Sequence, residues 1–171
     1  MSVQVQRSIT SPHLQAILAY WNALRRDRPA PQVADLDPLD IPTKSLPYVL
    51  LSDLQSRPFR IRYRLVGTHI ATLVGGDFRG RYLDQLRLPA DVFTMMRDDY
   101  AYVAWACQPV TGTYRWAKND GDSAIVQYTI LPLLEGNKVV RFLGAEHIDD
   151  PEYGHLLHAE DLVGVPWRET A

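Results

Sequence analysis

The sequence has few features that stabilise a chain outside the cell or anchor it to a membrane. Its single cysteine, Cys107, cannot form a disulfide within the chain. No apolar run approaches the ~20 residues that a membrane-spanning helix needs. The first ten residues, MSVQVQRSIT, lack the apolar stretch of a secretory signal. We therefore expect a cytoplasmic protein that has no membrane partner.

The sequence also has no large excess of positive or negative charge. Eighteen basic and 20 acidic residues leave a net charge of -2, so the chain as a whole does not attract nucleic acid or anionic lipid. Arg60, Arg62 and Arg64 alternate with apolar residues in FRIRYRLVG, residues 59–67. This alternation predicts a strand with one solvated face, and one row of arginines is too little for a nucleic-acid surface. We predict no nucleic-acid partner.

Motifs for catalysis, phosphate binding and metal binding are also missing. The glycines between residues 67 and 80 fit neither the dinucleotide-binding nor the phosphate-binding loop pattern, and no serine lies in a G-x-S-x-G turn. His155 and His158 have no third ligand at a recognised spacing. We predict no metal site and no enzyme. An enzyme with His69 or His147 as its base is the less favoured alternative.

The N-terminal third combines a helix with a proline-rich segment. Ser11 and Pro12 suit the capping and first positions of a helix. An apolar stripe follows at three- and four-residue steps, with Leu14, Leu18 and Trp21 among its members. Five prolines in residues 29–47 remove backbone donors and favour extended geometry. We expect that segment to be an extended crossing, neither helix nor central strand.

Later segments alternate with period two or carry helical spacing, and the two kinds are grouped. Helices are expected at 68–74 and 91–107, with Cys107 on the apolar face of the second. Strands are expected at 48–54, 59–67, 112–118, 123–134 and 139–148. This order predicts an α+β fold, a five-stranded antiparallel sheet with helices on one face plus the N-terminal amphipathic helix. The expected organisation is a flexible arm (1–10), the N-terminal helix and crossing (11–47), the core (48–148) and an acidic tail (149–171).

The inner face of this sheet and the helix at 91–107 would enclose a small-ligand site. Most of the side chains there are core, but some carry a polar tip, and a mostly apolar pocket with a few polar groups is typical of ligand sites. The residues predicted to bind the ligand are Tyr63, Leu65, His69, Met96, Tyr100, Val103, Tyr128 and Phe142.

Four stretches, taken in order, resemble the bacterial PAS-domain family PAS_5. They are DLDPLDIP at 35–42, YRLVGT at 63–68, GRYLDQL at 80–86 and LPL at 131–133. The resemblance covers about residues 11–148 and implies a five-stranded antiparallel sheet that acts as a sensory or interaction module. It implies no catalytic residues and no shared cofactor, so the cofactor stays unknown. The flavin photosensor run asparagine-cysteine-arginine-phenylalanine is absent.

We therefore expect a stand-alone PAS-like regulator that binds a small ligand, a protein partner, or both. A chain of 171 residues leaves no room for an output domain beside this core, so the signal would leave through protein contacts. An amphipathic stripe of this kind packs either on its own sheet or on a partner. We expect the partner surface to consist of Leu14, Leu18 and Trp21. A homodimer is expected, and a histidine kinase or response regulator is a further candidate partner. The alternative is a constitutive scaffold with a filled core.

Overall fold

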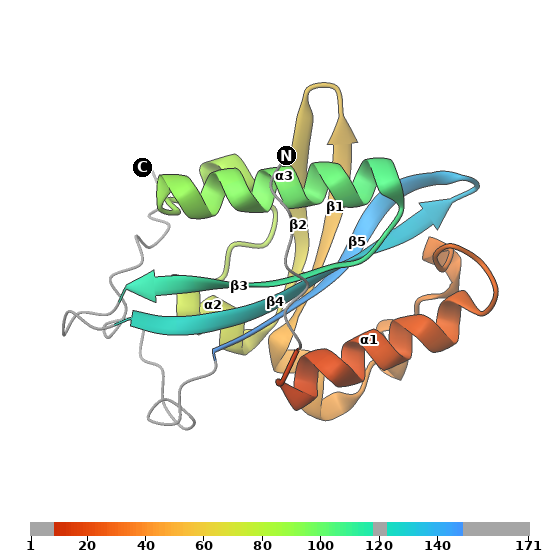
Figure 1. The fold of residues 1–171 in the computed structure, drawn as a ribbon, viewed down its shortest axis with the longest axis horizontal. Coiled ribbons are helices and arrows are strands. Elements are labelled where there is room, and N and C mark those ends of the chain that lie inside the picture. Colours follow the sequence, from red (N-terminus) through yellow and green to blue (C-terminus); the bar gives the residue numbers. More distant parts are fainter. Residues whose placement is uncertain (1–8, 118–122, 149–171) are drawn as a thin grey trace.

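One antiparallel sheet organises the chain. Figure 1 shows the computed structural model, which describes residues 9–117 and 123–148. The strands are β1 (Val49–Ser56), β2 (Phe59–Val66), β3 (Val110–Ala117), β4 (Ser123–Glu135) and β5 (Lys138–Ile148). They form a five-stranded sheet in the order β2-β1-β5-β4-β3, and all neighbours pair antiparallel. The predicted fold class is confirmed. The acidic tail, with His155 and His158, and most of the N-terminal arm lie outside the described residues.

Within the described residues three α-helices accompany the sheet, and their ends follow local chemistry. They are α1 (Pro12–Arg25), α2 (Thr68–Val74) and α3 (Ala90–Ala106). The Ser11 side chain accepts a hydrogen bond from the Leu14 backbone N–H, as its position before Pro12 predicts. Gly75 ends α2 in the left-handed conformation, with φ of 90°. None of the helices in the described part of the chain is long and apolar enough to cross a membrane.

The proline-rich segment contains more helix than its sequence predicts. Three short 3₁₀ helices occupy it, Val33–Asp35, Pro38–Asp40 and Thr43–Tyr48. The expectation of an extended crossing was therefore wrong in part. Proline suits the first position of a helix because its missing N–H has no partner there, and a 3₁₀ turn needs few residues. The Asp37 side chain, for example, accepts from the Leu39 backbone N–H and begins one of these turns.

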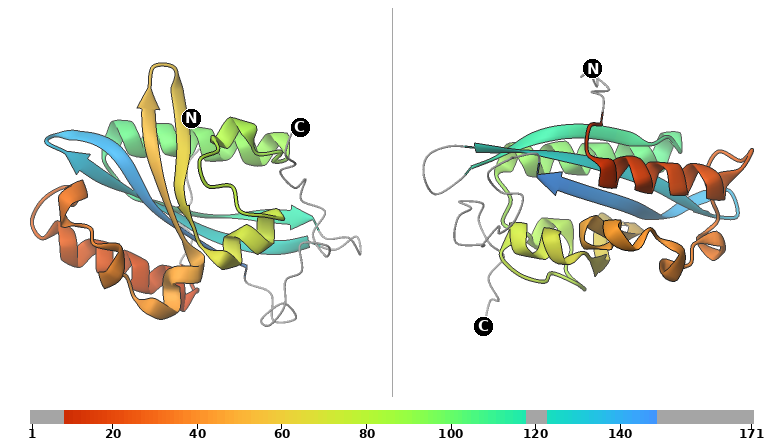
Figure 2. Two further views of the ribbon diagram at one scale, coloured as in Figure 1. Left: turned by 180° about the vertical axis from the view of Figure 1, so that it is seen from behind. Right: turned by 90° about the horizontal axis from the view of Figure 1, so that it is seen from below.

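The two faces of the sheet are covered by different helices. The side chain of Tyr128 on β4 reaches Asp99 of α3, whereas the side chain of its neighbour Gln127 accepts from the backbone N–H groups of Thr10 and Ser11. Because successive side chains of a strand point to opposite faces, α3 covers one face and α1 the other. We call these the inner face, which includes Tyr128, and the outer face, which includes Gln127. Figures 1 and 2 show α3 and α1 on either side of β3, β4 and β5.

The core is continuous through both layers. On the outer face Leu14, Ile17 and Trp21 of α1 are buried, and the Trp21 indole N–H donates to the Pro132 carbonyl at 2.8 Å. Gly67 precedes α2 at a point where a Cβ would lie 2.3 Å from the Pro47 carbonyl oxygen. Only glycine permits this approach of two backbones, and it holds α2 against the segment that leads into β1.

Candidate functional site: a carboxyl group among four tyrosines

Four tyrosines from four elements gather around Glu146 of β5. They are Tyr63 on β2, Tyr100 on α3, Tyr114 on β3 and Tyr128 on β4, and all four are buried. Tyr128 lies directly opposite Glu146 in the β4–β5 register. The charge of Glu146 acts on the pKa of each of the four phenols. We call these five residues the tyrosine cluster.

Hydrogen bonds fix two of the phenols on carboxyl groups. The Tyr114 hydroxyl donates to Glu146 Oε2 at 3.0 Å, and the Tyr128 hydroxyl donates to Asp99 Oδ2 at 2.5 Å. Gly112 makes the second bond possible, because a Cβ on Gly112 would lie 2.6 Å from the Tyr128 hydroxyl oxygen. Asp99 of α3, a buried carboxyl group, therefore stands next to the tyrosine cluster, in which Glu146 itself is half-buried.

The electrostatics of the tyrosine cluster are unusual for a protein interior. Burial raises the pKa of Glu146 to about 7, and the hydrogen bond from Tyr114 opposes this only partly. Among the described residues no cationic side chain pairs with Glu146. Burial also raises the pKa of Tyr100 to about 12 and that of Tyr114 well above its usual range. At neutral pH the phenols therefore remain hydrogen-bond donors, while Glu146 is poised to gain or lose a proton.

An open groove leads from the surface to this region. It lies between α3 and the edge strand β3, with a volume of about 1470 Å³. Its lining includes Asp98, Asp99, Tyr102, Tyr114, Arg115 and Tyr128. Asp99, Tyr114 and Tyr128 are the buried members of that group, so the groove reaches the hydrogen bonds just described. Arg115 is exposed and donates to the Ser123 hydroxyl at 3.2 Å.

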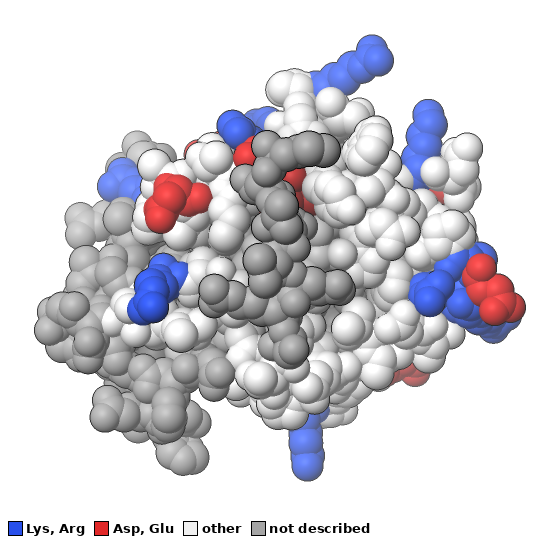
Figure 3. All heavy atoms as spheres, in the orientation of Figure 1, with Lys and Arg blue, Asp and Glu red and all other residues white. Residues whose placement is uncertain are grey.

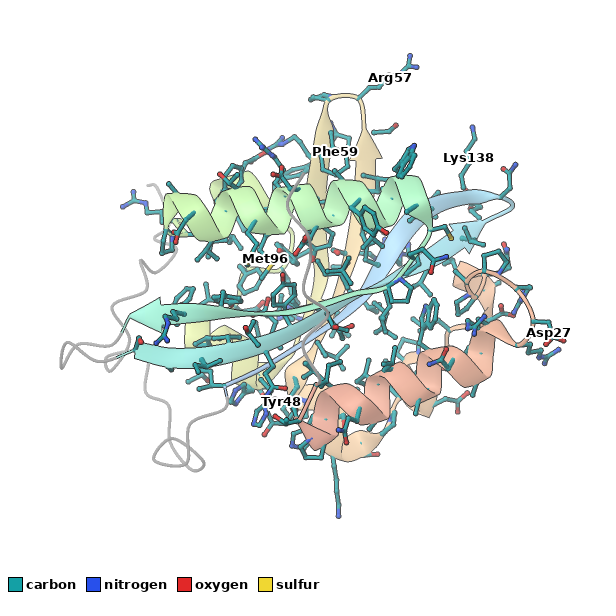
Figure 4. The ribbon with its side chains drawn as sticks, in the orientation of Figure 1. Asp27, Tyr48, Arg57, Phe59, Met96 and Lys138 are labelled. Carbon is teal, nitrogen blue, oxygen red and sulfur yellow. The ribbon has the colours of Figure 1, made fainter. Side chains whose placement is uncertain are left out.

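Most of the predicted ligand residues lie together under α3. Tyr100 packs on Phe142 with ring centroids 4.9 Å apart, and both are buried. In Figure 4 Met96 lies on the side of α3 that faces the sheet. The predicted residues that share this buried layer are Tyr63, Met96, Tyr100, Val103, Tyr128 and Phe142. Leu65 is only half-buried, near the end of the edge strand β2.

Three functional candidates were missed by the sequence reasoning. Glu146 continues the alternation of Phe142 and Gly144, so the period-two pattern of its strand could have found it. Tyr114 occupies the corresponding place in β3, opposite Val126 of β4. Asp99 follows Met96 by three residues on the covered face of α3. Each was overlooked because a charged or polar residue in a strand or helix is more often solvated than buried.

His69 belongs to a different group, which corrects its predicted place in the ligand site. Its ring lies 4.5 Å from Tyr48 and 5.7 Å from His147, and His13 stacks on Tyr48 at 3.9 Å (centroid distances; Tyr48 is labelled in Figure 4). His147 follows Glu146 in β5, so its side chain points to the opposite face. We call His13, Tyr48, His69 and His147 the histidine cluster. Among residues 9–117 and 123–148, no His, Cys, Asp or Glu group could hold a metal ion.

Burial lowers the pKa of His69 to about 4, with further contributions from His147 and His13. The imidazole is therefore uncharged at neutral pH, and its Nε2 is buried without a hydrogen-bond partner in the described part of the chain. A base needs to reach its substrate, and this ring packs against Tyr48 away from the groove. The described geometry therefore does not favour His69 as a catalytic base.

The apolar stripe of α1 packs within the chain, which corrects the predicted partner surface. Leu14 and Trp21 are 0% and 2% exposed, and Leu18 is half-buried. The physical reason is that the outer face of β4 and β5 is itself apolar and needs a cover. α3 instead carries two exposed aromatic side chains, Trp105 (86% exposed) and Tyr102 (43%), and Tyr102 lines the groove.

The arginines of β2 face solvent, as their alternation predicts, and each has a local partner. Arg60 pairs with Asp84 at 2.6 Å and Arg64 with Asp53 at 2.9 Å. Figure 3 shows blue and red side chains scattered over the visible face, without a continuous patch of one sign.

Comparison with known proteins places this geometry in context. The family model PAS_5, described as a PAS domain, matches residues 9–146. No curated protein matches the sequence. A PAS domain from Colwellia psychrerythraea is 21% identical, with a TM-score of 0.46, 66% of this chain and 97% of that chain covered. A sensory box histidine kinase/response regulator from Burkholderia thailandensis is 11% identical, with a TM-score of 0.42 and coverages of 66% and 85%. A light-oxygen-voltage domain is 22% identical, with a TM-score of 0.46 and coverages of 62% and 79%.

Proposed function

The chain belongs to the PAS_5 family of PAS domains, which is typically sensory rather than catalytic, and from this premise we propose that it is a ligand-controlled regulatory domain. A small molecule would reach the tyrosine cluster through the groove between α3 and β3. Occupancy of the site by this molecule would then change how the domain binds a partner protein. The proposal keeps the ligand site under α3 that the sequence predicts, and adds Asp99, Tyr114 and Glu146 to it.

One observation carries this proposal. Glu146 is a carboxyl group placed among buried phenols, with a pKa raised to about 7 by burial and one hydrogen bond from Tyr114. A buried carboxyl group costs free energy unless it is paired or fully hydrogen-bonded. A structural core gains nothing from such a group, whereas binding sites commonly hold groups with shifted pKa values.

The site contacts both α3 and the sheet, whose relative arrangement would carry the signal. Tyr100 and Asp99 belong to α3, and Tyr63, Tyr114 and Glu146 belong to three strands. A ligand that contacts both sides favours one arrangement of α3 on the sheet over another, provided that it binds that arrangement better. A coupling of about 1–3 kcal/mol is enough for regulation.

The signal would leave through protein–protein contacts. α3 carries the buried Tyr100 on one side and the exposed Trp105 on the other. A movement of this helix therefore changes the surface that Trp105 presents. A second copy of the chain and a separate signalling protein are the two outlets that this proposal allows.

The test is native mass spectrometry of the purified protein, combined with a thermal-shift screen of small molecules. We expect a non-covalent mass excess or a stabilising compound for the wild type. Both should be weakened in Tyr114→Phe and Tyr128→Phe, which keep the rings and remove the hydroxyl groups. Tyr20→Phe on α1 is the matched control, since this tyrosine lies outside the cluster and donates only to the Asp37 carbonyl.

The second candidate function is the constitutive scaffold, in which the core is filled and no ligand binds. The close packing of Tyr100 on Phe142 is the observation in its favour. A wild-type protein with no bound mass, and no stabilising compound in the screen, would favour the scaffold and contradict the ligand-controlled function.

A further inference from the structure

We infer that the ligand of the tyrosine cluster is a small organic cation, an ammonium compound whose charge lies beside Glu146 and against the tyrosine rings. This inference rests on the proposed function and narrows it to one chemical class. It is drawn from the charge, the aromatic walls and an unfilled hydrogen-bonding position on the inner face of the sheet.

The charge of the site argues against an anionic ligand. The buried Asp99 lines the groove together with the exposed Asp91 and Asp98, of which Asp98 pairs with Arg97. Glu146 is half-buried and lies behind the groove lining, bonded to the hydroxyl of Tyr114. The basic side chain in the groove lining, Arg115, is exposed and bonded to Ser123. A phosphate or carboxylate ligand would therefore meet like charge. A cation would instead supply the counter-charge that Glu146 lacks among the described residues.

The aromatic walls suit the same class. Ammonium groups are attracted to the faces of tyrosine rings when they lie within about 6 Å of the ring centroid. The rings of Tyr114 and Tyr128 are 5.8 Å apart and tilted by 50°, so they present their faces from different directions. Both hydroxyl groups are turned onto carboxyl oxygens. This arrangement leaves the rings as walls and the carboxyl groups as the charged end of the site.

A second observation on the inner face is a buried hydrogen-bond donor that has no partner in the described residues. Trp116 lies two residues from Tyr114 on β3, hence on the same face, with ring centroids 6.2 Å apart. It is 1% exposed, and its indole Nε1 has no hydrogen-bond partner in the described ranges. Buried N–H donors are rarely left unpaired. A ligand that carries a hydroxyl or carbonyl oxygen beside its ammonium group would fill this position.

The experiment compares three probes of one shape by isothermal titration of the full chain. They are benzylammonium, benzyl alcohol and benzoate, which differ in charge. At pH 8 we expect benzylammonium to bind about ten-fold more tightly than benzyl alcohol, since close charge pairs at interfaces contribute at least about that much to affinity. Benzoate should bind most weakly. Glu146→Gln should remove the preference for the cation, and Glu135→Gln in the exposed β4–β5 hairpin is the matched control.

A second measurement uses the wild type alone. Around Glu146 the titratable groups are Tyr114 of β3, Tyr128 of β4, Tyr63 of β2, and Tyr100 and Asp99 of α3. The pKa values of all four phenols are raised, so they stay neutral from pH 5 to 8. Protonation of Glu146 should therefore lower the affinity for benzylammonium at pH 5.5 and leave that for benzyl alcohol nearly unchanged.

Several outcomes would overturn the inference. They are equal binding of the three probes, a preference for benzoate, a cation preference that survives in Glu146→Gln, and no binding of benzylammonium at millimolar concentration. If the last occurs while the wild type still shows a bound mass that Tyr128→Phe loses, the ligand-controlled function stands and only the cationic class is rejected. If the bound mass is also missing, both proposals fall.

Discussion

Glu146 and His147 are neighbours in β5, yet they face opposite sides of the sheet and differ in their electrostatics. On the inner face, burial raises the pKa of Glu146 to about 7 among phenols. On the outer face, His147 lies with His13 and His69, and burial lowers the pKa of His69 to about 4. On both faces, burial thus shifts the pKa of a titratable group in the direction that favours its uncharged form. Acid favours the uncharged form of Glu146 and opposes that of His69.

The two faces also differ in how their polar side chains are hydrogen-bonded within the chain. On the outer face several buried polar groups are hydrogen-bonded within the chain, as with Trp21 and Pro132 or Gln127 and Ser11. His69 Nε2 is an exception there among the described residues. On the inner face Glu146 keeps a single described hydrogen bond and no counter-charge. We interpret the outer face as the structural half of the core and the inner face as the half adapted for binding.

The largest effect on stability is expected from a substitution that removes packing between α1 and the outer face. Trp21→Ala removes a fully packed indole and its bond to the Pro132 carbonyl, and should lower the free energy of unfolding by about 3–5 kcal/mol. Urea unfolding followed by circular dichroism measures this. Trp21→Phe, which keeps most of the packing, should cost clearly less. A loss below about 1 kcal/mol for the alanine variant would mean that α1 is not part of the core.

The next largest effect concerns the inner face and has the opposite sign. Because the pKa of Glu146 is raised in the folded state, its contribution to stability is present below pH 4.5 and is lost as the pH rises through about 7. Glu146→Gln should therefore raise the free energy of unfolding at pH 8 by about 1–3 kcal/mol. Near pH 4 the two proteins should be equally stable. Destabilisation at pH 8 would show that the carboxylate is paired in the folded protein.

A smaller effect is expected from the histidine cluster. The pKa of His69 is lowered in the folded state, so its contribution is present above pH 6.5 and is lost as the pH falls toward 4. After allowance for partial exposure of the ring, this loss should be about 1–2 kcal/mol. Unfolding measured at pH 7, 5.5 and 4.5 should give a shallower slope for His69→Gln than for wild type. Identical slopes would remove His69 from the pH response.

The fold could be predicted well from sequence because its signals are local. The alternation in FRIRYRLVG, the Ser11-Pro12 helix start and Gly75 at the end of α2 each report on their own segment. The 3₁₀ turns between Val33 and Tyr48 were missed because proline permits both extended backbone and short helices.

The candidate site was predictable only in its apolar part. Periodicity assigns each residue of an element to one of its faces. It therefore predicts the inward-facing residues Tyr63, Tyr100, Tyr128 and Phe142. Periodicity does not say which elements meet across that face. The pairing of Tyr114 with Glu146 depends on β3, β4 and β5 lying in that order, and the bond from Tyr128 to Asp99 on the packing of α3. His69 was misplaced for the same reason.

The segment that contains α1 is attached to β4 and its hairpin at both ends. Thr10 and Ser11 bond to the Gln127 side chain, and beyond α1 the Gln32 side chain exchanges two hydrogen bonds with Gly136. Because the segment is held at both ends, α1 cannot leave the sheet unless both sets of hydrogen bonds break. We therefore expect amide hydrogen exchange in α1 to occur only when the sheet opens globally, so its exchange rate would report on the cohesion of the whole domain.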